Sequence, residues 1–92
     1  MPWTLGTTST FDRQAHKFLK KHPEMRQRLE EVLKRLAVDP FDPALRLHAL
    51  TGKLNGLQAI RIDYRYRIVL TLQVHAEEIL LLDIGSHDVV YK

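Results

Sequence analysis

Residues 56–70 read GLQAIRIDYRYRIVL and residues 79–91 read ILLLDIGSHDVVY, and these two stretches decide the fold. Both are rich in apolar, β-branched and aromatic residues, which is typical of strands. Alternate side chains of a strand point to opposite faces, so Ile60 and Ile62 share one face and Arg61 lies on the other. The pattern predicts strands over residues 57–63, 66–74 and 79–84, with residues 76–78 as a hairpin link between the last two.

The first half of the chain shows helical periodicity instead. Two apolar stripes recur at helical spacing, one at Phe11, Ala15, Phe18 and Leu19, the other at Met25, Leu29, Val32, Leu33 and Leu36. Ser9 suits the start of the first helix and Pro23 the first turn of the second. Residues 39–43, DPFDP, end the second helix because each proline disfavours the α conformation for the residue before it.

These elements predict a single α+β domain over residues 1–92. A short strand candidate at residues 3–8 precedes the two helices, and three strands follow them, in the order β-α-α-β-β-β. We expect an antiparallel sheet of about four strands with the helical hairpin packed on one face. The other face stays partly open, and residues 45–54 are not assigned to an element.

Composition narrows the class of protein. The chain has 92 residues and no cysteine, so it forms one modest core without disulfides or a thiolate metal site. It has neither an apolar run of membrane-spanning length nor a start that resembles a signal peptide, so we expect a cytoplasmic protein and no membrane partner. A net charge of +3 favours anionic partners slightly, although solubility explains it equally well.

The distribution of charge is more informative than its sum. Residues 55–82 contain Arg61, Arg65 and Arg67 but no lysine. Arginine binds phosphate through two parallel hydrogen bonds and stays charged, so this cluster favours RNA handling. Alternatively, Arg61 pairs with Asp63 or Asp83. Residues two apart on a strand share a face, but the turn between the two strands is not placed. Arg65 and Arg67 therefore cannot both be assigned to the site, and we favour Arg65 there with Arg67 in support.

Several motifs occur together in a characteristic order: LTGKLNG at residues 50–56, YRIV at residues 66–69, and LDIGSHD at residues 82–88 before a closing Tyr91. With Arg61-Ile62 between the first two, they resemble the RelE/ParE toxin superfamily, whose element order is also β-α-α-β-β-β. The Gly-Ser-His ending is most similar to its YafQ-type branch. The resemblance implies a type II toxin that cleaves mRNA, mostly in the ribosomal A site, and that a cognate antitoxin holds inactive.

The same resemblance implies site residues. His48 matches a histidine that YafQ-like toxins place just before the Leu-x-Gly motif, and His87 matches their C-terminal catalytic histidine. Arg61 stands where YafQ has a histidine and RelE-like members have arginine, and Arg65 stands where YafQ has an aspartate. Tyr91 matches the closing aromatic. We expect these five residues to form a catalytic site that needs no metal and no cofactor.

Other readings of these residues remain open. His87 could be an exposed histidine of the tail, His48 a loop histidine, and Tyr91 a cover for the core. We expect Lys53 and Arg67 to contact RNA. Lys17 and Lys20 are further RNA-backbone candidates, or part of a solvated helix face.

Rival functions remain open as well. A ParE-like inhibitor of DNA gyrase would share the fold but would not need the two histidines. A catalytically inactive module that binds only the antitoxin is the second alternative.

Overall fold

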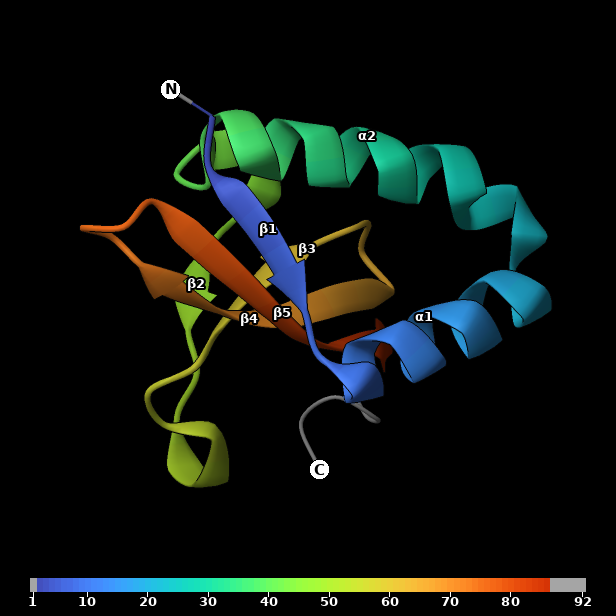
Figure 1. Ribbon diagram of the computed structural model, residues 1–92. Helices are drawn as coiled ribbons and strands as arrows, with labels where there is room; N and C mark the ends of the chain where they lie inside the picture. The colour runs from blue at the N-terminus through green and yellow to red at the C-terminus, as the bar shows by residue number, and fades with distance from the viewer. Residues whose placement is uncertain (1, 87–92) are drawn as a thin grey trace.

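The computed structural model describes residues 2–86. Two helices cover one face of a five-stranded sheet (Figure 1). The helices are α1 (Ser9–Lys21) and α2 (Arg26–Val38). The strands are β1 (Thr4–Thr7), β2 (His48–Ala49), β3 (Gln58–Arg61), β4 (Tyr66–Gln73) and β5 (Glu78–Ser86). Single 3₁₀ turns lie at Pro23–Met25, Pro43–Leu45 and Gly52–Leu54. Within residues 2–86, no helix has the length and apolar character needed to cross a bilayer.

The sheet has the strand order β1-β5-β4-β3-β2. Its three hairpin-type pairs are antiparallel, whereas β1 runs parallel to β5. The α+β class, the element order and the position of the helices are therefore confirmed. Two details differ from the expectation of about four antiparallel strands. The sheet has a fifth strand, β2, whose two residues are too few to show a periodicity. Strand β1 pairs in parallel, and an alternating pattern does not reveal the direction of pairing.

One hydrophobic core joins the helices to the sheet. Leu29, Val32 and Leu36 of α2 lie in the same buried cluster as Ile60 of β3 and Ile68 of β4. The two isoleucines are paired across the strands, so they project to the same face. Since Ile60, Ile68 and Leu36 are completely shielded from solvent, burial of apolar area fixes which face of the sheet the helices cover.

Helix α1 begins at Ser9, as the sequence suggests, but the residue that caps it is Thr8. The Thr8 hydroxyl accepts a hydrogen bond from the Phe11 N–H at 3.1 Å and donates one to the Leu81 carbonyl at 3.1 Å. The threonine therefore satisfies a free donor of the helix and also ties α1 to strand β5.

The face opposite the helices is covered in part. Leu50, Ala59 and Val69 form a second buried cluster there, against which Leu54 and Leu57 pack. The segment between β2 and β3 thus folds over the middle of this face. Arg61 at the end of β3 and Arg67 near the start of β4 remain partly exposed on this face.

The turn between β3 and β4 is organised by Asp63. One carboxylate oxygen accepts hydrogen bonds from the backbone N–H groups of Arg65 at 2.7 Å and Tyr66 at 3.1 Å, and the other accepts from the Arg65 guanidinium at 3.0 Å. Burial alone would raise the pKa of Asp63, but these hydrogen bonds outweigh it and hold the pKa below its ordinary value of 3.8. Strand β3 therefore ends at Arg61, earlier than predicted, because the chain turns to meet this carboxylate.

Replacing Asp63 with alanine should lower the free energy of unfolding by about 1–2 kcal/mol, because two turn N–H groups lose their acceptor. The matched Asp63→Asn variant keeps an acceptor oxygen and should lose at most about 1 kcal/mol, since the Arg65 partner is 44% exposed. A carboxylate with a depressed pKa stabilises the fold above pH 3.8 and loses that contribution as the pH falls through its folded pKa.

Urea unfolding of the wild type and the Asp63→Asn variant at several pH values measures this effect. The difference in unfolding free energy should shrink below about pH 4. A difference that stays constant down to pH 2 would contradict the role of this carboxylate.

Candidate nucleic-acid interface

Basic side chains gather on the open face of the sheet, beside β2 and β4. Two adjoining cavities of about 520 and 420 Å³ share His48 and Arg67 as lining residues. Lys53 lines the first cavity, and Arg46 and Arg61 line the second. We call the surface formed by these five residues the basic cleft. No acidic residue of the described chain lines either cavity, so the cleft presents positive charge to an anionic ligand.

The two central arginines lie directly opposite each other. Arg61 of β3 is paired in register with Arg67 of β4, which places their Cβ atoms about 4.5–5.5 Å apart. Both project away from the core because their neighbours Ile60 and Ile68 project into it. Like charges directly opposite each other destabilise a sheet. An anion bound between the two guanidinium groups would offset this cost.

The sequence offered Asp63 or Asp83 as partners for Arg61. Asp63 is instead engaged by Arg65, and Asp83 accepts the backbone N–H of Ile84 at 2.8 Å. Within residues 2–86, Arg61 forms no ion pair with either. Neither aspartate therefore neutralises the charge of Arg61.

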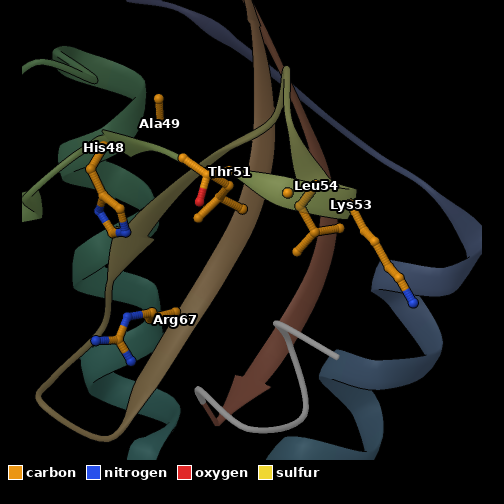
Figure 2. Close-up of a pocket in the computed structure, with 8 residues that line it drawn as sticks. His48, Ala49, Thr51, Lys53, Leu54 and Arg67 are labelled. Atoms are coloured by element: carbon orange, nitrogen blue, oxygen red, sulfur yellow. The ribbon is translucent and has the colours of Figure 1, made fainter.

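His48 enters the cleft from β2 with a defined orientation. Its Nδ1 lies 2.8 Å from the carbonyl oxygen of Arg46. A carbonyl oxygen can only accept, so Nδ1 donates this hydrogen bond and the neutral ring carries its lone pair on Nε2. Figure 2 shows the His48 ring of β2 and the Arg67 guanidinium of β4 projecting into the same space, while the Lys53 side chain extends away from them. The second nitrogen of His48 is thus suited to accept a proton.

Arg65 lies elsewhere. Its guanidinium contacts Asp63 and the Met25 sulfur, at 3.8 Å from the latter, and it stacks over the Tyr66 ring at 4.9 Å. The hydrogen bond to Asp63 raises the pKa of Arg65 further. Because Arg65 belongs to the turn rather than to β4, strand alternation does not apply to it. The structure brings Arg67, rather than Arg65, together with His48 and Arg61.

The remaining predicted residues fall outside the cleft or outside the described chain. Lys17 and Lys20 are exposed residues of α1 that line neither cavity of the cleft. His87 and Tyr91 lie outside the described residues. The nearest described position is the end of β5, where Gly85 is paired with Arg67. Strand β5 therefore ends beside the basic cleft.

Arg46 is a component of the cleft that the sequence did not single out. It adopts a left-handed backbone conformation, with φ of 53°, which is uncommon for a residue with a side chain. Its carbonyl orients His48 and its side chain lines the same cavity. The available signal was its spacing of two from His48, which would have placed both on one side of an extended segment.

No group of three or more His, Asp or Glu side chains that could hold a metal ion occurs among residues 2–86. The chemistry that the described cleft itself offers is phosphate binding by arginine and proton transfer by histidine.

Comparison with solved structures shows the same fold in known toxins. YafQ from Escherichia coli BL21(DE3) is 12% identical, with a TM-score of 0.79 over 98% of this chain and 99% of that one. A copper-bound mutant toxin from Helicobacter pylori is 26% identical, with a TM-score of 0.73 over 98% and 99% of the two chains. A chain of the E. coli DinJ–YafQ toxin–antitoxin complex is 12% identical, with a TM-score of 0.78 over the full length of both.

Sequence comparison identifies the family. No curated protein sequence matches the chain significantly. The profile of the family described as "Bacterial toxin of type II toxin-antitoxin system, YafQ", however, matches residues 3–92, which is nearly the whole chain. The predicted resemblance to the RelE/ParE superfamily is thereby confirmed, and the chain belongs to the YafQ family of bacterial type II toxins.

Proposed function

We propose that this toxin is an mRNA endoribonuclease that cleaves without a metal ion. The observation that supports the proposal is the basic cleft, in which His48 and the paired Arg61 and Arg67 line adjoining cavities with no described carboxylate. Cleavage of RNA by its own 2′-hydroxyl needs a proton acceptor, cations for the charge that develops on phosphorus, and a proton donor for the leaving oxygen.

The residues divide these tasks. Nε2 of His48 accepts the proton of the 2′-hydroxyl, whose oxygen attacks the adjacent phosphorus. Arg61 and Arg67 hold the non-bridging oxygens of the phosphorane through charge-assisted hydrogen bonds. The bond from phosphorus to the 5′-oxygen then breaks, and His87 protonates that oxygen. The products are a 2′,3′-cyclic phosphate and a free 5′-hydroxyl.

Two further residues position the substrate in this proposal. Lys53, at the edge of the cleft (Figure 2), neutralises a flanking phosphate. Tyr91 stacks on a base, as aromatic side chains do in the recognition of single-stranded RNA.

The proposed partners are mRNA on the ribosome and a cognate antitoxin. A chain of this fold forms a complex with an antitoxin in the E. coli DinJ–YafQ structure. A cleft that carries positive charge is complementary to an acidic segment that folds on binding. Such a segment over His48 and Arg67 would block access of RNA.

Primer extension on mRNA from cells that express the toxin tests the proposal. We expect discrete new 5′ ends that disappear when the antitoxin is co-expressed. Gyrase-dependent breaks in DNA, with mRNA intact, would show the activity of a ParE-like inhibitor and contradict the nuclease assignment.

Chelation should leave cleavage unchanged. We expect the purified toxin to cut RNA on ribosomes at the same rate after dialysis against EDTA and restoration of magnesium for the ribosome alone, because the proposed proton and charge transfers use side chains. A rate that falls at least tenfold and returns only when a transition metal is added would contradict a metal-independent mechanism.

A further inference from the structure

Strand β5 ends beside α1 on the helix side of the sheet (Figure 1). A further cavity with basic walls lies there, separate from the two of the basic cleft. It measures about 400 Å³, within the range of about 300–1,000 Å³ typical of ligand pockets. Lys17 and Lys21 of α1 line one side, and Tyr66 of β4 with Gly85 and Ser86 of β5 line the other. We call this cavity the α1 hollow.

The walls of the α1 hollow place two like charges close together. Lys17 and Lys21 are four residues apart and therefore neighbours on one face of the helix, where like charges destabilise it. Among the described residues that line the hollow none is acidic. A phosphate held between the two ammonium groups would remove this repulsion, since lysine binds phosphate as a mobile point charge.

The floor of the hollow is apolar. Phe18 and Tyr66 are buried, with their rings 4.9 Å apart in an edge-to-face arrangement, and Ile84 lies beside them. His22, at one edge, has its Nε2 3.4 Å from the Tyr66 hydroxyl. An apolar floor below two cations suits a nucleotide, whose base or ribose packs on the floor and whose phosphate faces the lysines.

The α1 hollow and the basic cleft lie on opposite faces of the same end of the sheet. Tyr66 and Arg67 are consecutive residues of β4, so their side chains project to opposite faces. Their partners on β5 are Ser86 and Gly85, in the same order. The start of β4 and the end of β5 therefore separate the two cavities, and a single RNA strand that passes around this edge would reach both.

We propose that the α1 hollow binds a nucleotide of the same RNA strand that is cleaved in the basic cleft, next to the scissile phosphate, with Lys17 and Lys21 as its phosphate contacts. The inference rests on the proposed nuclease function and deepens it, because it gives the RNA a path from the cleft across the end of β5. It assigns the role of phosphate contact to Lys21 rather than to Lys20, since Lys17 and Lys21 line the hollow.

Binding of a short single-stranded RNA tests the hollow directly. The probe carries 2′-O-methyl groups at every position, so that the toxin cannot cleave it, and binding is followed by fluorescence anisotropy at several salt concentrations. The double variant Lys17→Ala/Lys21→Ala should bind about tenfold more weakly than the wild type. Its plot of log affinity against log salt should be shallower by about 0.7–1.4, which corresponds to one or two phosphate contacts on a single strand.

The control variant removes the same charge elsewhere. Arg26→Ala/Lys34→Ala also loses two cations, but from exposed positions of α2 that do not line the hollow, and it should bind within about twofold of the wild type. Alanine favours helix at all four positions. Equal weakening by both double variants would show a general effect of net charge and overturn the proposal.

The remaining outcomes separate this proposal from the proposed function. If the wild type binds and cleaves RNA but Lys17→Ala/Lys21→Ala binds it unchanged, the α1 hollow is not an RNA subsite and the nuclease assignment stands. If that variant loses affinity for the antitoxin instead, the hollow is a protein-binding surface and the proposal is wrong. A wild type that neither binds nor cleaves RNA would overturn both.

Discussion

Replacing Arg67 with alanine should lower the rate of mRNA cleavage by about 10²–10³-fold, the usual effect of removing one preorganised donor from developing charge. The guanidinium lines both cavities of the basic cleft and lies in register with Arg61, so it can hold the phosphorane from one side while Arg61 holds it from the other. Arg61→Ala should therefore cause a loss of similar size. Single-turnover cleavage of a defined mRNA on purified ribosomes measures both rates.

Two further variants make this prediction specific to the geometry. Arg67→Lys keeps the charge but not the fork of two parallel hydrogen bonds, so it should recover only a small part of the lost rate. The matched control is Arg65→Ala, which removes the same side chain from the turn, where it binds Asp63. It should reduce the unfolding free energy rather than the rate. If Arg65→Ala at equal folded concentration loses as much activity as Arg67→Ala, our choice between the two arginines is wrong.

That choice illustrates what the sequence could predict. The alternation of Ile60, Arg61 and Ile62 correctly predicted which side of β3 is buried in the core and which is accessible. The same rule failed for Arg65, because the hydrogen bonds of Asp63 turn the chain after β3 and remove Arg65 from the regular strand. The Asp63 carboxylate competes with strand pairing for the backbone N–H groups here. The pattern of apolar residues alone does not predict this.

The helices were predictable because their apolar stripes extend over several turns. A shift of one residue in the N-cap, from Ser9 to Thr8, therefore leaves the buried face unchanged. The two-residue strand β2 and the left-handed Arg46 were not predictable. Strand β2 depends on its pairing with β3, and Arg46 ends the 3₁₀ turn Pro43–Leu45. The parts of the basic cleft that the sequence missed are therefore short segments with no periodicity of their own.

Exchanging the two histidines for glutamine should separate the acid from the base. In the proposed mechanism His48 acts unprotonated and His87 acts protonated, so the rate of the wild type should rise and then fall with pH. His48→Gln should lower the maximal rate by about 10²-fold or more and remove the rise on the acidic side, because no base remains to be deprotonated. His87→Gln should cause a loss of similar size and remove the fall on the alkaline side.

The matched control is His75→Gln, an identical change at an exposed position between β4 and β5, which should preserve both limbs of the profile. The assignment of His48 as the base rests on its Nδ1 donating to the Arg46 carbonyl at 2.8 Å, which leaves Nε2 as the acceptor in the neutral ring. If His48→Gln loses the alkaline limb and His87→Gln the acidic one, the roles are reversed, and His48 must then work as an imidazolium that donates from both nitrogens. If neither variant changes the shape of the profile at matched soluble expression, proton transfer belongs to other groups and the arginines remain the supported part of the mechanism.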